Sequence, residues 1–139
     1  MISYNTVGVE MPPIDQPRVS AWVRQVAERY GKKVGDINFI FVSDEEILRI
    51  NREYIQHDYY TDHIGFDYSS GNVLSGDVFI GVETVASNAE LIGETYRREL
   101  HRVIIHGVLH LCGIKDKTPE LRMQMEAAEN AALALAVWL

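Results

Sequence analysis

Two histidines four residues apart, followed by a glycine and an aspartate, are the residues of this sequence best suited to chemistry. They are His106 and His110, with Gly113 and Asp116 after them. Residues four apart on an α-helix share one face, with about 5 to 6 Å between their Cβ atoms, so both rings can reach one metal ion. Glycine adopts the left-handed backbone that ends a helix, so the chain can reverse after Gly113. The spacing predicts a metal site made of His106, His110 and Asp116.

This ligand set is typical of a catalytic zinc site. Two neutral histidines and one carboxylate leave the fourth position of a tetrahedral Zn²⁺ open for water, and the ion lowers the pKa of that water towards neutrality. The expected catalytic group is therefore the bound water, and no residue is assigned to an organic cofactor. The same ligands suit ferrous iron, so another divalent transition metal is an alternative to zinc.

The residues alone leave other interpretations of this segment open. A histidine pair at this spacing also occurs on helix surfaces and, when hydrogen bonded, in protein cores. His57 and His63 are rival third ligands if Asp116 points away, but neither has a helix-ending glycine to bring it to the pair. Three aspartates could either hold ring N–H groups or cap turns and strands, namely Asp58, Asp62 and Asp77.

A zinc protease would share the histidine spacing but needs a glutamate directly after the first histidine as its general base. Here that position is Gly107. Peptide hydrolysis is therefore disfavoured, whereas phosphodiester cleavage stays open, with either water or a ribose 2′-hydroxyl as the attacking group.

The pattern of hydrophobic residues predicts the elements that must position these side chains. Four strands and four to five helices indicate an α+β domain with one small mixed sheet and a metal site on a helix in the C-terminal half and the following loop. Strands are expected at residues 3–9, 36–42, 62–68 and 77–82. Helices are expected at 19–31, 44–56, 83–92 and 94–112, and from Thr118 nearly to the C-terminus.

Composition sets the broad class. A length of 139 residues with 47% hydrophobic side chains fits one domain over residues 1–139. The net charge of -7 argues against coating nucleic acid by charge alone, and the single cysteine, Cys112, cannot form an internal disulfide. No signal peptide and no apolar run of bilayer length is present, so we expect a cytoplasmic protein that does not contact a membrane.

Several segments together resemble the YbeY family of bacterial metal-dependent endoribonucleases, which are rRNA maturation factors. The family signature His-Gly-x-Leu-His-Leu-x-Gly-Tyr-Asp-His aligns with residues 106–116, and its third zinc ligand, a histidine, falls on Asp116. The blocks Asn51-Arg52-Glu53-Tyr54, Thr61-Asp62-His63-Ile64-Gly65-Phe66 and Gly76-Asp77-Val78-Phe79-Ile80 are similar to further family segments. The resemblance covers most of the chain.

The resemblance implies a zinc-dependent endoribonuclease that cuts single-stranded RNA in maturation of the small ribosomal subunit and in ribosome quality control. Its partners are then RNA and the small subunit. The arginine that follows the tyrosine in the family falls on Ile55, and Arg52, one helical turn earlier, is a catalytic candidate for that role. A non-catalytic ribosome-assembly factor with a structural metal, and a metallohydrolase on another substrate, are the alternative functions.

Overall fold

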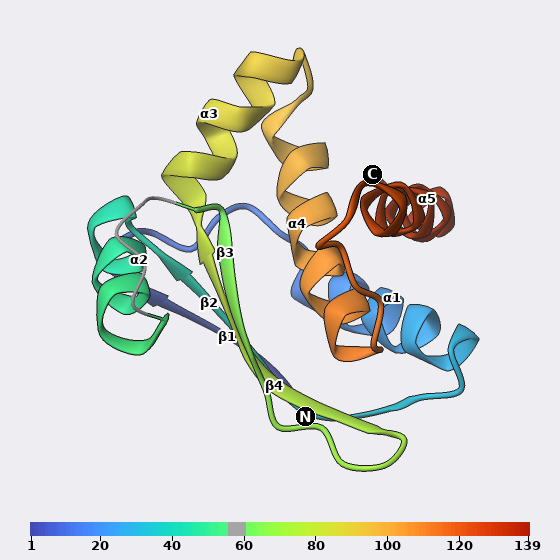
Figure 1. Ribbon diagram of the computed structural model, residues 1–139. Helices are drawn as coiled ribbons and strands as arrows, with labels where there is room; N and C mark the ends of the chain where they lie inside the picture. Colours follow the sequence, from blue (N-terminus) through green and yellow to red (C-terminus); the bar gives the residue numbers. More distant parts are fainter. Residues whose placement is uncertain (56–60) are drawn as a thin grey trace.

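The computed structural model describes residues 1–55 and 61–139, and one four-stranded sheet organises them (Figure 1). The strands are β1 (Ile2–Val7), β2 (Lys33–Val42), β3 (His63–Asp67) and β4 (Val73–Gly81). The helices are α1 (Gln16–Arg29), α2 (Asp44–Ile50), α3 (Val82–Ile92), α4 (Tyr96–Leu111) and α5 (Pro119–Leu135), and α2 continues into a π-helical turn, η1 (Asn51–Ile55). The predicted end of the second helix at Gln56, and His57 and Asp58, lie outside the described residues.

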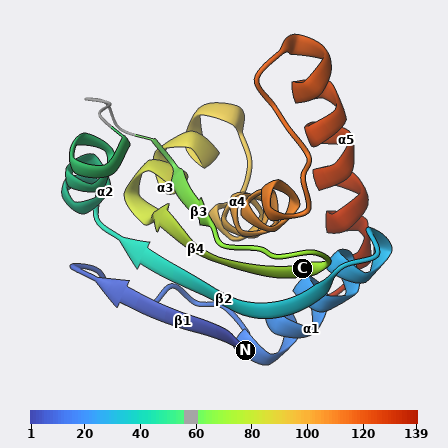
Figure 2. The ribbon, with the colours of Figure 1, turned by 60° about the horizontal axis from the view of Figure 1, so that its bottom comes forward.

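The sheet is mixed, as predicted. Its strand order is β1-β2-β4-β3, in which β1, β2 and β4 run parallel and β3 runs antiparallel to β4. Figure 2 shows β1 and β3 as the two outer strands, with α4 lying above β3 and β4. Because β3 is an edge strand beside α4, side chains on its inner face reach the helix that carries the histidine pair.

Alternating side chains divide the sheet into an inner and an outer face. On the inner face Phe39, Phe41 and Val78 are fully buried against α1 and α4 in the main hydrophobic core. On the outer face Ile64 packs with Ile47 and Ile50 of α2 in a second, smaller cluster. This period-two pattern is what the hydrophobic alternation of the sequence predicts for a sheet with one face in the core, and α2 covers only part of the other face.

Two strands, β2 and β4, begin at least three residues earlier than the sequence predicts. β2 starts at Lys33 instead of residue 36, and β4 starts at Val73 instead of residue 77. The added residues pair with one another, because Lys33 lies opposite Val73 and the register shifts between Val34 and Ile37. Backbone pairing continues there, but Gly35, Ser75 and Gly76 separate the few apolar residues of these segments, so the hydrophobic alternation is too short to indicate a strand.

Two helices also start at residues other than the predicted ones, and their N-cap residues explain where they start. α1 starts at Gln16 instead of residue 19, since the Asp15 side chain accepts a hydrogen bond from the Arg18 N–H and Pro17 suits the first turn. α4 starts at Tyr96 with Thr95 as its N-cap, not at residue 94.

Among the described residues, none of the helices is both long and apolar enough to cross a membrane.

Helix α4 also buries His101, which gives a testable dependence of stability on pH. The ring is 1% exposed beside Trp22 and Trp138, and its Nδ1 lies 2.6 Å from the Arg97 carbonyl oxygen. Its Nε2 is buried without a hydrogen-bond partner among the described residues. Burial lowers the pKa of His101, so the folded protein resists protonation that the unfolded chain accepts below a pKa of 6.5.

We therefore expect the free energy of unfolding to fall as the pH drops below 6.5, and to fall less in a His101→Phe variant. The contribution of His101 is fully present above the pKa of the unfolded chain and is lost as protons bind that chain. Urea unfolding at pH values above and below this point, in chelator to remove metal, measures the effect. An identical fall in both proteins would contradict the prediction.

Candidate metal centre

Helix α4 presents His106 and His110 on one face, one turn apart, as their spacing predicts. Their ring centroids lie 4.6 Å apart. The His106 side chain is 13% exposed and that of His110 is 34% exposed, so both rings sit at the margin of the core and are reachable from outside. The apolar neighbours on α4 hold the helix against β4 and thereby fix where the two rings point.

The chain reverses after α4 through the predicted glycine. Gly113 adopts a left-handed φ of 99°, its N–H donates to the His110 carbonyl, and the Ile114 N–H donates to the Leu109 carbonyl. This closing pattern satisfies carbonyls at the helix end and turns the chain back under α4. As a result Asp116 Oδ2 lies 3.2 Å from His110 Nε2 and 3.4 Å from His106 Nε2.

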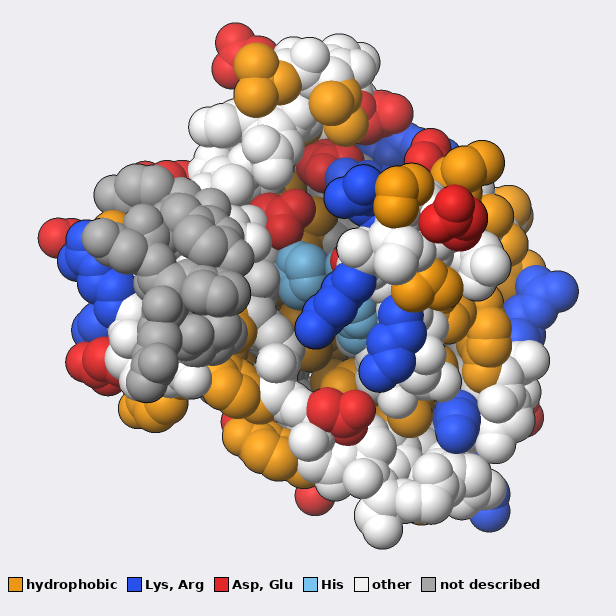
Figure 3. Space-filling model, in the orientation of Figure 1, with side chains coloured by type: hydrophobic (Ala, Val, Ile, Leu, Met, Phe, Trp, Pro, Cys, Tyr) orange, Lys and Arg blue, Asp and Glu red, His pale blue; other side chains and the backbone are white. Residues whose placement is uncertain are grey.

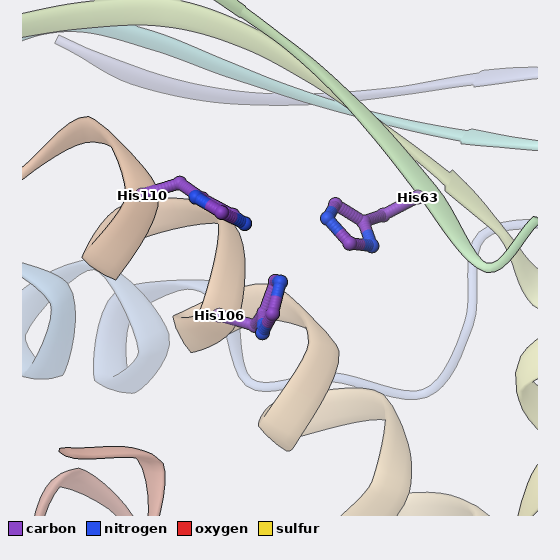
Figure 4. A group of neighbouring side chains, drawn as sticks. All are labelled: His63, His106 and His110. Carbon is purple, nitrogen blue, oxygen red and sulfur yellow. The ribbon is translucent and has the colours of Figure 1, made fainter. Parts of the chain in front are cut away.

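A third histidine, His63, approaches from the opposite side. It lies opposite Ile80 in the β3–β4 register, so it shares the inner face of the sheet and points at α4. Its ring centroid lies 4.5 Å from that of His106 and 5.9 Å from that of His110. One ring nitrogen from each histidine lies within 4.8 Å of the others, and Figure 4 shows the three rings around a common space.

The distances to Asp116 fit a metal site. Ligand atoms 2.0 to 2.2 Å from a tetrahedral Zn²⁺ lie about 3.3 to 3.6 Å from one another, which is close to the 3.2 and 3.4 Å spacings of Asp116 Oδ2. His106 Nε2 is buried and has no hydrogen-bond partner among the described residues. A buried polar nitrogen normally has a partner, and a cation held between His106, His110 and Asp116 would supply one for this nitrogen. Imidazole and carboxylate are ligands that Zn²⁺ accepts.

Two carboxylates lie at hydrogen-bonding distance from the Nδ1 atoms of His106 and His63. Glu129 Oε2 of α5 lies 2.5 Å from His106 Nδ1, and Asp62 Oδ1 lies 2.8 Å from His63 Nδ1. Burial acts to raise the pKa of both carboxyls, but hydrogen bonds and positive charge outweigh it and lower the pKa of each. Ionised acceptors at Nδ1 favour the tautomer that leaves Nε2 unprotonated and able to bind a metal.

Burial also determines the protonation state of His110. Together with the charge of His106 it lowers the pKa of His110, and the nearby Asp116 opposes this only in part. His110 is therefore a neutral imidazole near pH 7, which is the form that coordinates a metal.

Close packing explains the glycine between the two histidines. A Cβ added at Gly107 would lie 2.8 Å from Val78 Cγ1 of β4, closer than side chains pack. The position where a zinc protease carries its glutamate therefore faces the sheet and has no room for a side chain. This packing supports the sequence argument against peptide hydrolysis.

The histidines line an open hollow. A space of about 550 Å³ between α3, α4 and α5 is lined by His63, His106 and Asp116 together with Arg102, Arg122 and Glu129. A neighbouring hollow of about 300 Å³ reaches His63 and His110 from the side of Lys115. Figure 3 shows histidine at the floor of this depression with Lys and Arg side chains on one rim. A polymer can therefore reach the rings from outside.

The other predicted site residues lie apart from the rings. Arg52 lines a separate hollow of about 560 Å³ with Glu46 and Glu53, and none of the three histidines borders it. Asp77 accepts a hydrogen bond from Asn38 Nδ2 at 2.8 Å on the outer face of the sheet. The catalytic role of Arg52 stays a prediction, to which this arrangement lends no support.

Comparison with known proteins identifies the family. A family model described as endoribonuclease YbeY matches residues 7–136. The protein named endoribonuclease YbeY from Phocaeicola vulgatus is 61% identical over 135 residues, which cover 97% of this chain and 98% of that protein. The Bacteroides thetaiotaomicron protein of the same name is 57% identical over 134 residues, or 96% of this chain and 98% of that protein.

A solved structure shares the fold. The solution structure of TM1509 from Thermotoga maritima is 24% identical and superimposes with a TM-score of 0.66, covering 96% of this chain and 90% of that one. The family match, the two close relatives and the shared fold agree with the histidine geometry. The chain belongs to the endoribonuclease YbeY family.

Proposed function

We propose that this protein is a metal-dependent endoribonuclease that cuts single-stranded RNA in the maturation of small-subunit rRNA and in ribosome quality control. It acts as one metallohydrolase domain over residues 1–139, in the cytoplasm, with RNA and the small ribosomal subunit as partners. The observation that carries the proposal is the convergence of His106, His110 and Asp116, with His63 opposite, at the base of two neighbouring open hollows. Membership of a family whose named members are endoribonucleases supports it.

The proposed metal is Zn²⁺, held by His106, His110 and Asp116. When bound, it supplies a Lewis acid that neutralises charge on a phosphate and activates water near neutral pH. A set of three protein ligands is typical of catalytic and not structural zinc. The carboxylate in place of a third imidazole lowers the net charge of the centre, which makes the ion a weaker Lewis acid than it would be with three neutral ligands.

The chain's own residues position the substrate around this centre. His63 faces the space between the rings from β3, and its ring is fixed by Asp62, so it lines the entrance that a phosphodiester must use. Arg122 and Lys115 border the two hollows and supply positive charge for flanking phosphates in an otherwise acidic protein. Open access on both sides suits a flexible single strand better than a rigid duplex.

The proposal is tested with purified protein, a labelled single-stranded RNA, a matched duplex and a peptide library. We expect about one transition-metal ion per chain, cleavage of the single strand only, loss of cleavage in chelator and recovery on adding Zn²⁺. Co-sedimentation with isolated small subunits checks the partner.

Two outcomes would overturn the proposal. Cleavage that persists unchanged in chelator would exclude a metal-dependent mechanism. Binding to the small subunit without cleavage of any RNA by the zinc-loaded protein would instead support the non-catalytic assembly factor.

A further inference from the structure

A line of charged side chains runs along α4 behind the metal centre. Glu99, Arg102 and His106 are spaced three and four residues apart, so they share one face of the helix, and that face meets Glu129 of α5. Arg102 Nε donates to Glu99 Oε1 at 2.8 Å, and a second guanidinium nitrogen donates to the other Glu99 oxygen. The remaining Arg102 nitrogen, Nη1, donates to Glu129 Oε1 at 2.9 Å.

This network is buried. The side chains of Glu99 and Glu129 are 1% and 4% exposed, and that of Arg102 is 34% exposed. Removing two carboxylates from water is unfavourable, and a buried ion pair is often no more stabilising than apolar side chains of similar size. Stability alone therefore gives little reason for three charged side chains at this helix contact. A specific geometric role accounts for them better.

The geometry of Glu129 shows what that role is. One of its oxygens accepts from Arg102 and the other lies 2.5 Å from His106 Nδ1, so the carboxylate cannot rotate without losing a partner. The planar guanidinium of Arg102 is itself fixed by a bidentate pair of hydrogen bonds to Glu99. With Nδ1 occupied in this way, His106 Nε2 faces Asp116 Oδ2 at 3.4 Å and accepts no hydrogen bond from any residue that the structure describes.

We propose that Glu129 is a positioning residue of the metal centre, which fixes the tautomer and ring orientation of His106 and is itself held by Arg102 and Glu99. The inference rests on the proposed metal binding of His106. Outer partners of metal-bound histidines typically change metal affinity about 10- to 100-fold when removed. We expect a loss of that size in Glu129→Gln, where the amide can no longer accept at both oxygen positions.

A matched control is available on the same helix. Glu126 is exposed and borders the same hollow, so Glu126→Gln removes the same charge from α5 without touching His106. Affinity for Zn²⁺ is measured by competition with a chromophoric chelator. We expect the control to bind within about threefold of the original protein, because exposed charges interact weakly with a site through water.

A second measurement needs no metal. In the metal-free protein, ¹⁵N NMR of the imidazole reports which ring nitrogen carries the proton. We expect His106 to be protonated at Nδ1 in the original protein and in Glu126→Gln, and to become a mixture of tautomers in Glu129→Gln. A purely structural contact between α4 and α5 would lower the unfolding midpoint without changing this signal.

The two measurements separate failure of this inference from failure of the proposed function. A folded Glu129→Gln protein with unchanged Zn²⁺ affinity and an unchanged His106 tautomer would overturn the positioning role. If the original protein binds no metal, the proposed function fails, but the tautomer comparison still decides the role of Glu129. Should Glu129→Gln not fold, Glu129→Asp keeps the charge and shortens the side chain, and the same loss of affinity and of the single tautomer is expected.

Discussion

We expect His106→Ala and His110→Ala each to weaken Zn²⁺ binding by about a hundredfold or more and to remove most of the metal-dependent RNA cleavage. Zinc sites of small domains release about 10 to 16 kcal/mol on binding at neutral pH, which is about 2.5 to 5 kcal/mol for each of three or four ligands. Each 1.4 kcal/mol is about a tenfold change in affinity, so loss of one ligand weakens binding by about a hundredfold or more. Chelator competition and cleavage of a labelled single strand measure the two effects.

The control for this prediction is His101→Phe, which removes a histidine from the same helix without touching the hollow. We expect it to bind Zn²⁺ and to cleave RNA as the original protein does. Near-ultraviolet circular dichroism shows whether the variants keep their packing. A folded His106→Ala protein with full metal content would refute the placement of the metal on α4.

The part of the site that a sequence can predict is the part that is local in the chain. His106 and His110 meet because a helix repeats every 3.6 residues, and Asp116 meets them because Gly113 permits a left-handed turn at the helix end. The α+β class and the mixed sheet follow in the same way from alternating and helical hydrophobic patterns. Each of these inferences depends on residues at most a few turns apart.

The contacts that the sequence does not predict directly are made by distant segments. From the sequence, His63 is only a rival to Asp116, because no glycine brings it to the pair; the sheet brings it instead, through the pairing of β3 with β4 at the edge beside α4. Glu129 follows His106 by 23 residues and reaches it only through the packing of α5 on α4. Strand order and helix packing decide both contacts, and neither leaves a local pattern. A histidine on the inner face of a predicted strand was the available signal for His63.

Two single substitutions test whether Asp116 or His63 is the third metal ligand beside His106 and His110. We expect Asp116→Ala to weaken Zn²⁺ binding by about a hundredfold, since a ligand contributes about 3 kcal/mol. We expect His63→Val, which suits a strand, to stay within about tenfold of the original affinity, because in this case His63 faces the metal without being one of its ligands. Asp116 Oδ2 lies at ligand spacing from both α4 nitrogens, whereas the His63 nitrogen is placed only within 4.8 Å of them.

Co²⁺ in place of Zn²⁺ gives a second measure of the same choice, because its visible spectrum depends on the ligand atoms and their number. With Asp116 as the third ligand, the spectrum changes strongly in Asp116→Ala and little in His63→Val, and Glu126→Ala controls for the lost charge. The reverse pattern would assign the metal to three imidazoles, His63, His106 and His110, with Asp116 as a neighbouring anion. In that case the sheet edge, and not the turn after α4, supplies the third ligand, and the centre keeps the Lewis acidity that a carboxylate ligand would reduce.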